Sequence, residues 1–188
     1  WRRAGDVTLR SDWGEDANLI ALHGGSNREV GGALDAGSIL LEMGGIRFLS
    51  ATGGAEALPP MLRRRAEGQN TVAVDPPAEP YPDQDVRATA KITEAKSAPD
   101  RAFAAVNLTG ISEKLLRAKR GALLYAHRSV AVVQDEMQLS APGTVVWNAY
   151  TEAKIVKNGG RYLLLERGGK ILLCRLYGGG TSKFELTP

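Results

Sequence analysis

The sequence predicts an all-β protein, an antiparallel β-sandwich that is supersandwich-like, with many short strands and hairpins. Three observations lead to this expectation. Many short apolar runs are separated by Gly, Pro, Asn and Asp residues. Diglycine pairs join several of these runs. No window of about 12 residues keeps a clean apolar period of 3.6, so long helices are not expected.

The expected strands follow one another along the whole chain. The stretch VRATAKITEAK shows the alternation of small and polar residues that is typical of a strand with two different faces. The predicted strands cover residues 7–10, 18–23, 38–41, 46–50, 71–74, 88–95, 101–108, 115–124, 129–138, 145–151, 153–156, 162–166, 170–177 and 182–186.

Two-residue glycine links indicate tight hairpins. Gly44-Gly45 and Gly168-Gly169 each stand between two apolar runs, and Asn158-Gly159-Gly160 forms a slightly longer link. The turns that suit the twist of paired strands require positive φ at both central residues, which glycine adopts without strain. Each link therefore predicts an antiparallel strand pair.

Three segments do not fit the strand pattern. Residues 62–67 are the best helix candidate, short and very basic. Residues 75–85 (DPPAEPYPDQD) contain four prolines, which excludes a central strand and predicts a surface loop. Residues 178–180 are three glycines, which predict a flexible turn.

Length and composition are those of one globular domain covering 1–188, with 43% hydrophobic and 24% charged residues. No apolar run approaches the roughly 18 residues of a membrane span, so no span is expected. The net charge of +3 is compatible with an acidic polymer as ligand, but the sequence lacks the dense basic patches and motifs of a nucleic-acid binder. Because the chain begins at Trp1, we interpret it as a fragment of a longer protein.

The single cysteine and the two histidines do not form a reactive or metal-binding set. Cys174 lies inside an apolar run, which favours a small buried thiol and leaves no partner for an internal disulfide. His23 and His127 have no His, Cys or carboxylate at ligand spacing, so both are interpreted as surface or turn residues.

Basic and aromatic residues suggest two ways of binding a saccharide. Arg63, Arg64 and Arg65 could clamp a carboxylate or sulfate, although a solvated face is the simpler reading. Aromatic rings could stack on sugars, but one inside an apolar run, such as Trp147, is more typical of the core. The other candidate rings are Trp13, Tyr150 and Tyr177.

Several stretches in order carry a family resemblance. They are SDWGEDANLIALHGG (11–25), GGALDAGSILLEMGGIRFL (31–49), RAEGQNTVAVDPP (65–77), KRG (119–121), SVAVVQDEM (129–137) and VVWNAYT (145–151). Together they resemble the C-terminal β-sandwich domain of the heparinase II/III-like family of polysaccharide lyases. In that family an N-terminal α/α toroid, absent here, precedes the sandwich. The resemblance implies that such a toroid is a partner within the same chain.

The resemblance also implies a chemistry whose residues are missing. The family performs β-elimination at a uronic acid with His and Tyr, and many members hold a structural zinc ion in the sandwich. The family motif H-x-H-x-D-x-x-S keeps Asp35 and Ser38 here, but its histidines fall on Gly31 and Ala33. A further family aspartate falls on Ser50 or Ala51, and a further histidine falls on Gln69.

These departures predict that the zinc site is lost, that no cofactor binds and that no catalytic residue lies in this chain. Neither Gly nor Ala can take a proton or bind a metal. Asp35 is then expected to be a turn residue whose carboxylate caps backbone N–H groups. Any retained contact with an acidic polysaccharide or oligosaccharide is expected from Arg63, Arg64, Arg65, Gln69 and Asn70.

The sequence therefore favours a non-catalytic member of this family, a pseudoenzyme domain that is structural or carbohydrate-binding within a larger saccharide-processing protein. Two alternatives stay open: the sandwich half of an active lyase whose catalytic residues come from the toroid, and an interaction module without a sugar ligand. The resemblance implies a secreted or periplasmic location.

Overall fold

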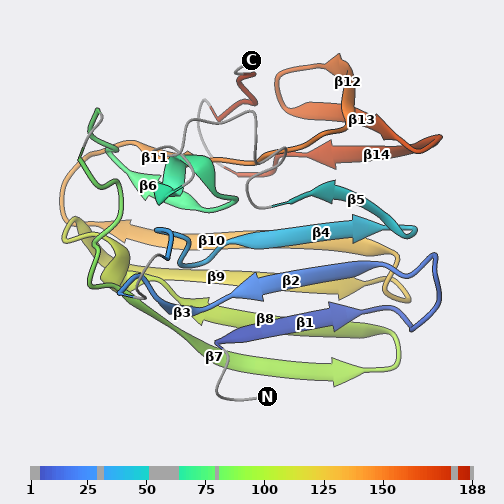
Figure 1. Ribbon diagram of the computed structural model, residues 1–188, viewed down its shortest axis with the longest axis horizontal. Helices are drawn as coiled ribbons and strands as arrows, with labels where there is room; N and C mark the ends of the chain where they lie inside the picture. The colour runs from blue at the N-terminus through green and yellow to red at the C-terminus, as the bar shows by residue number, and fades with distance from the viewer. Residues whose placement is uncertain (1–4, 29–31, 51–63, 79–80, 179–181, 187–188) are drawn as a thin grey trace.

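The computed structural model describes residues 5–28, 32–50, 64–78, 81–178 and 182–186. In them, antiparallel strands stack in two layers (Figure 1). One layer is a four-stranded sheet in the order β1-β2-β4-β5, and the other is a five-stranded sheet in the order β10-β9-β8-β7-β3. Their bounds are β1 Asp6–Arg10, β2 Leu19–His23, β3 Gly25–Ser26, β4 Ile39–Met43, β5 Ile46–Leu49, β7 Thr89–Ala98, β8 Arg101–Asn107, β9 Leu115–Tyr125 and β10 Val130–Leu139.

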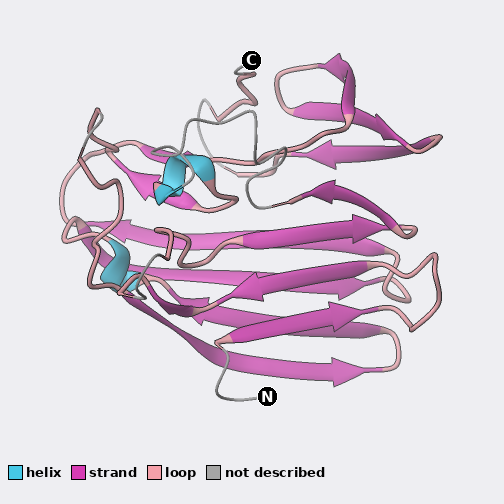
Figure 2. Cartoon of the chain, viewed as in Figure 1, coloured by secondary structure: helices cyan, strands magenta, loops and turns pink. Residues whose placement is uncertain are grey.

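Helical structure is confined to short turns. The described residues contain no α-helix, and their 3-10 helices are Ala66–Gly68 and Thr109–Ile111 (Figure 2). The all-β prediction is therefore confirmed, as is the antiparallel sandwich. None of the helices in the described ranges is long and apolar enough to cross a membrane.

The main core lies between the two large sheets. Ile20 and Leu22 of β2 face Val106 of β8 and Leu124 of β9, and all four are fully buried. Alanines on the inner faces of β8 and β9 leave room for these larger side chains. Burying each aliphatic side chain stabilises the fold by about 1.5–3 kcal/mol. The inner alanines are Ala102, Ala104, Ala118 and Ala122.

Two smaller sheets lie beyond the edge of the four-stranded sheet (Figure 1). They are β6 (Val72–Val74) with β11 (Val145–Trp147), and β12 (Lys154–Asn158), β13 (Tyr162–Arg167) and β14 (Lys170–Arg175). A second apolar cluster joins Phe48 of β5 to Leu163 and Leu165 of β13. The three-stranded sheet is thereby fixed to the sandwich.

The diglycine links form the tight turns that the sequence predicts. Gly44 and Gly45 have φ values of 58° and 73°, and Gly168 and Gly169 have 57° and 72°. At Gly45 the space is also closed, because a Cβ would lie 2.0 Å from the carbonyl oxygen of Glu15. The predicted β4–β5 and β13–β14 hairpins are therefore confirmed, and the positive φ values at their glycines are the reason that the turns need glycine.

The turn between β9 and β10 is unusual. Ala126, His127 and Arg128 all have positive φ, at 52°, 56° and 61°. The Arg128 guanidinium donates to Ser97 Oγ at 2.7 Å and to the carbonyl oxygen of Ala98 at 2.6 Å, which holds the turn against the β7–β8 hairpin. His127 is exposed, as expected for a turn residue.

Four details of the strand prediction are corrected. Residues 182–186 form no strand, because the backbone bond there runs from Phe184 to the turn residue Gly160. The strand expected at 145–151 ends at Trp147, since Asn148 and Tyr150 turn to bond the segment at 70–71. The helix expected at 62–67 is only a 3-10 turn in its described part. The short strand Gly25–Ser26 was not predicted.

Three further expectations are met only in part. Residues 75–78 and 81–85 form an irregular loop, but Asp83 and Gln84 in it are buried, and 79–80 lie outside the described residues. The glycine turn expected at 178–180 is described only at Gly178. Cys174 is half-buried on β14, and burial raises the pKa of its thiol to about 11. A thiol with such a pKa is inert at neutral pH.

Candidate functional site

The segment from Leu34 to Ile39 forms a turn docked against the end of β2. Gly37 N donates to the carbonyl oxygen of His23 at 3.0 Å, and His23 N donates to that of Ser38 at 2.8 Å. Ser38 N closes the turn on the carbonyl oxygen of Asp35 at 2.8 Å. The turn predicted around Asp35 is therefore formed. The predicted capping of backbone N–H groups is not seen in the described residues, because the Asp35 carboxylate lies beside the imidazole of His23.

His23 lies between two carboxylates. Its Nδ1 is 2.5 Å from Oδ1 of Asp6, which is its register partner on β1. Its Nε2 is 3.4 Å from Oδ1 of Asp35. Asp35 and then Asp6 raise the pKa of His23 to about 9, although partial burial of the ring opposes this shift. The imidazole is therefore protonated at neutral pH, a state that can donate a proton and cannot accept one.

A groove of about 210 Å³ opens beside this histidine on the outer face of the four-stranded sheet. The hydroxyl of Ser38 is buried and has no hydrogen-bond partner among the described residues. The groove thus combines a charged end with an apolar floor. Its lining residues are Asp6, Ala21, His23, Asp35, Ser38, Ile39 and Leu40.

From the sequence, His23 is expected to be a surface or turn residue. The sequence does not predict that Asp6 and Asp35 lie beside it. Asp6 precedes His23 by 17 positions and Asp35 follows it by 12, with no motif spacing between them. The β1–β2 register brings Asp6 to His23, and the docked turn brings Asp35. No local signal in the sequence carries either contact.

The structure brings together the separate stretches that carry the family resemblance. The Asn70 amide donates to the carbonyl oxygen of Ile39 at 2.9 Å and accepts from Tyr150 N at 2.7 Å. The Thr71 hydroxyl donates to the carbonyl oxygen of Ala36 at 2.6 Å. These side chains lock the Asp35 turn to the segments at 69–71 and 145–150.

Arg120 belongs to the KRG stretch of the resemblance, but the sequence did not predict its structural role. It is fully buried, and its Nε and Nη2 donate to the Asp135 carboxylate at 2.7 and 2.8 Å. Its Nη1 donates to the carbonyl oxygen of Gly37 at 2.6 Å. Its guanidinium also lies 5.9 Å from the ring centre of Trp147, which packs against the core as expected. The sequence does contain a signal for this burial. Side chains alternate between the two faces of a strand, and Arg120 lies on the same face of β9 as the inward residues Ala118 and Ala122.

The five candidate ligand contacts lie in different environments. Arg63 is outside the described residues, and Arg64 is exposed. Arg65 is buried and donates to the carbonyl oxygens of Pro77, at 2.8 Å, and Tyr81. Gln69 and Asn70 are also buried. Of the candidates in the described ranges, Arg64 therefore faces solvent while the others lie inside the protein.

The positions that correspond to the family site are partly visible. Gly31 and Ala51 lie outside the described residues. Ser50 N donates to the carbonyl oxygen of Tyr150 at 3.4 Å, so Ser50 lies beside the segment that Asn70 binds. Ala33, next to the docked turn, has no polar side chain. Within the described ranges, no three His, Cys, Asp or Glu side chains form a group that could hold a metal ion.

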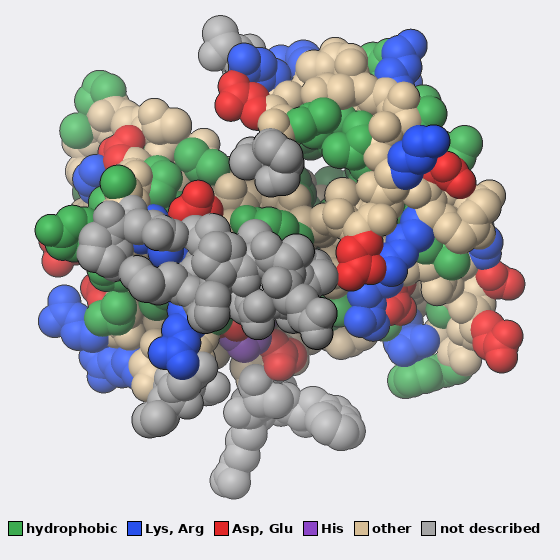
Figure 3. Space-filling view, turned by 45° about the horizontal axis from the view of Figure 1, so that its top comes forward, with side chains coloured by type: hydrophobic (Ala, Val, Ile, Leu, Met, Phe, Trp, Pro, Cys, Tyr) green, Lys and Arg blue, Asp and Glu red, His purple; other side chains and the backbone are tan. Residues whose placement is uncertain are grey.

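Charged side chains form no large patch of one sign on the face shown in Figure 3. Lys and Arg side chains there are interspersed with Asp and Glu. Trp13 and Tyr177 are 89% and 81% exposed, and the Arg10 guanidinium lies 4.8 Å from the ring centre of Trp13. Tyr150 is half-buried, and burial raises the pKa of its hydroxyl, which donates to the carbonyl oxygen of Glu67 at 2.5 Å.

The fold is similar to that of solved heparinase structures. A heparan sulfate lyase HepC from Pedobacter heparinus superposes with a TM-score of 0.73 and 19% identity over 92% of this chain. A heparinase III, the BT4657 gene product, gives a TM-score of 0.71 and 15% identity over 87%. No protein-family model matches the sequence, and no curated protein is similar to it. The fold is therefore heparinase-like.

This chain spans only about a quarter of the solved structures that it matches, 27% of the HepC chain and 26% of the BT4657 chain. It is thus similar to one part of larger proteins. The toroid partner, the zinc loss and the candidate contacts remain predictions.

Proposed function

We propose that the chain is a non-catalytic heparinase-like sandwich domain, a structural or carbohydrate-binding part of a larger saccharide-processing protein that is secreted or periplasmic. Its ligand is an acidic polysaccharide or oligosaccharide. The observation that supports this proposal is the use of the retained motif residues. The side chains of Asn70 and Thr71 bond backbone groups of the Asp35 turn, and Asn70 also accepts from the backbone N–H of Tyr150.

The positions of the family histidines support the same function. Ala33 and Gln69 stand at two of them, and neither side chain can act as a base or take the place of a histidine ligand to zinc. Without a general base, β-elimination loses about 10²–10⁴ in rate from that contribution alone.

Ultraviolet detection of unsaturated uronate products tests the absence of catalysis, with heparan sulfate and other acidic polysaccharides as substrates. Elemental analysis for zinc is run on the same preparation. We expect no product and no bound zinc. Turnover of any of these polysaccharides, or stoichiometric zinc, would overturn the proposal.

Binding is tested separately with a heparan sulfate oligosaccharide. Arg64→Ala should weaken binding several-fold with no change in the free energy of unfolding, because Arg64 is exposed. The matched control is Arg101→Ala, since Arg101 is an exposed arginine on β8. Equal affinities of the wild type and the Arg64 variant would remove Arg64 from the ligand contact.

The second candidate function is the sandwich half of an active lyase. His23 favours it, because a protonated imidazole in an open groove could supply a proton to a leaving oxygen. If turnover is detected, His23→Gln should lower kcat, whereas His127→Gln should not. An unchanged kcat in the His23 variant would exclude this role.

A further inference from the structure

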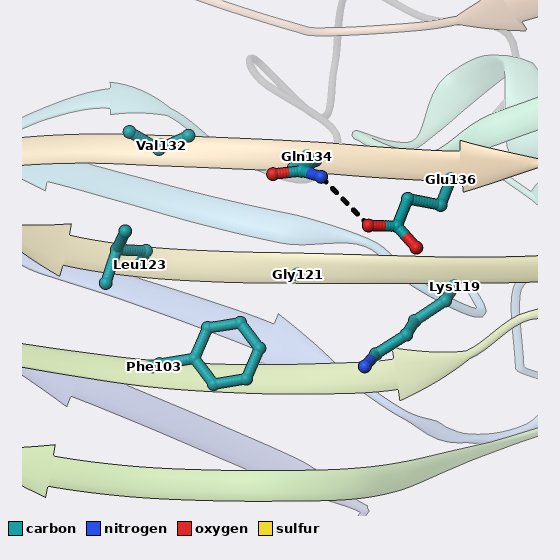
Figure 4. Close-up of a pocket in the computed structure, with 7 residues that line it drawn as sticks. All are labelled: Phe103, Lys119, Gly121, Leu123, Val132, Gln134 and Glu136. Carbon is teal, nitrogen blue, oxygen red and sulfur yellow. Dashed lines mark hydrogen bonds between the residues drawn. The ribbon is translucent and has the colours of Figure 1, made fainter.

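A hollow lies on the outer face of the five-stranded sheet, away from the Asp35 turn. The register stacks three rows across β8, β9 and β10 (Figure 4). The inner neighbours of these residues are buried in the core, so the alternation of the strands turns all three rows outward. The rows are Phe103–Leu123–Val132, Ala105–Gly121–Gln134 and Asn107–Lys119–Glu136.

The hollow exists because the middle row is small. Gly121 has no side chain, and its register partner on β8 is Ala105. The space above Gly121 measures about 110 Å³. A Cβ at Gly121 would lie 3.2 Å from Cε2 of Phe103, so the Phe103 ring forms one wall. Leu123 and Val132 extend this apolar wall across the sheet (Figure 4).

The opposite side is polar and already ordered. Lys119 Nζ donates to Oε1 of Glu94 at 2.9 Å, and Gln134 Nε2 donates to Oε1 of Glu136 at 2.9 Å. These pairs hold the side chains in place and leave further donor and acceptor sites open on each group. Lys119 and Glu136 are the charged residues that line the hollow, and the Glu94 carboxylate beside it also pairs with Lys96 at 3.5 Å, so positive and negative groups balance there.

We propose that this hollow binds one uncharged pyranose ring of a saccharide. The C–H face of the ring packs on Phe103 and Leu123, and its hydroxyls bond Gln134 and Glu136. The lining cation Lys119 is already paired with Glu94, and Glu136 stands beside it, so the hollow offers a uronate or sulfate no unpaired positive charge. This inference rests on the carbohydrate-binding function proposed above and assigns a second contact to it, distinct from Arg64.

Two ligands that differ by one carboxylate test the charge preference. Methyl β-D-glucopyranoside and methyl β-D-glucopyranosiduronate are titrated into the 15N-labelled protein over about 1–50 mM, the range expected for a single ring. We expect the neutral glucoside to shift the backbone amides of Phe103, Gly121 and Leu123. The glucuronide should bind at least about tenfold more weakly. Absence of shifts with the glucoside, or stronger binding of the glucuronide, would overturn the proposal.

Variants test the location. Gly121→Val fills the hollow with a side chain that suits a strand, and should weaken glucoside binding at least about tenfold. Gln134→Ala removes a surface contact without touching the core, and should weaken binding several-fold. Gln138→Val is the matched control, because Gln138 is exposed on β10 but does not line the hollow. Unchanged binding in both test variants would place the ligand elsewhere.

The outcomes for the two proposals can be told apart. Binding of acidic oligosaccharide without binding of the glucoside keeps the domain function and rejects this subsite. Elimination activity together with glucoside binding at Gly121 rejects the non-catalytic function and keeps the subsite.

Discussion

The Arg120 guanidinium joins Asp135 on the neighbouring strand to the carbonyl oxygen of Gly37, 83 positions away in the sequence. The Asp35 turn is therefore held from inside the sandwich by a buried cation. Arg120 thus contributes to the shape of this turn from the opposite sheet.

Arg120→Met should lower the free energy of unfolding by about 1–3 kcal/mol, mainly because it leaves the buried Gly37 carbonyl without its donor, while solvent reaches Asp135. Urea denaturation measures this loss. Arg101→Ala, an exposed arginine on the outer face, should stay within about 0.5 kcal/mol of the wild type. A loss below about 0.5 kcal/mol in the Arg120 variant would show that the hydrogen bonds of Arg120 contribute little.

The two carboxylates beside His23 predict a pH-dependent stability. The folded pKa of about 9 lies above the ordinary value of 6.5, so the folded protein binds the extra proton between these values. The stabilisation is fully present below pH 6.5 and disappears as the pH rises through 9. Urea denaturation at a series of pH values should show this decline in the wild type and a much smaller one in His23→Gln.

The histidine can also be titrated directly. NMR titration of the His23 ring should give a pKa near 9 in the wild type, and a lower pKa in Asp35→Asn and in Asp6→Asn. His127→Gln, at the exposed β9–β10 turn, serves as the control and simplifies the spectrum. A wild-type pKa near 6.5 would contradict the charged arrangement.

Features that depend on the local pattern of apolar and turn residues can be predicted from the sequence, and most of the strands are such features. The turns at 44–45 and 168–169 followed from glycine chemistry, and both have the positive φ expected. The strand at Gly25–Ser26 could not be found, because its definition depends on pairing with Thr89 and Ala90 of β7. The end of β11 at Trp147 depends in the same way on contacts with residues 70–71.

The candidate site shows the same division. The resemblance located the Asp35 turn, and the structure forms it. The contact of Asp6 with His23 arises from strand register, which the sequence does not specify. Arg65 illustrates the converse, since a basic run suggested a solvated face while the fold buries this arginine against the loop at 77–83.

Gly37 should tolerate no side chain. Its φ is +80°, and a Cβ would lie 2.8 Å from both terminal methyl groups of Leu108, which is fully buried. Gly37→Ala should lower the free energy of unfolding by about 2–4 kcal/mol, from the left-handed backbone and the overpacking together.

Two other glycines separate these causes by urea denaturation. Gly160 has φ +77° but open space around it, so Gly160→Ala should cost only about 1 kcal/mol. Gly110 has neither constraint, and Gly110→Ala should stay within about 0.5 kcal/mol of the wild type. Equal losses at Gly37 and Gly160 would show that Leu108 moves aside.

Asn70 should act mainly as a structural bridge. It is fully buried, and its amide links the carbonyl oxygen of Ile39 to the backbone N–H of Tyr150. Asn70→Ala leaves both groups without their partner and should lower the free energy of unfolding by about 2–4 kcal/mol. The control is Asn107→Ala, because Asn107 is exposed and its amide oxygen accepts from Thr109 N at 2.9 Å. Its loss should be about 1 kcal/mol or less. If the two variants lose similar stability, the bridge does not hold the Asp35 turn.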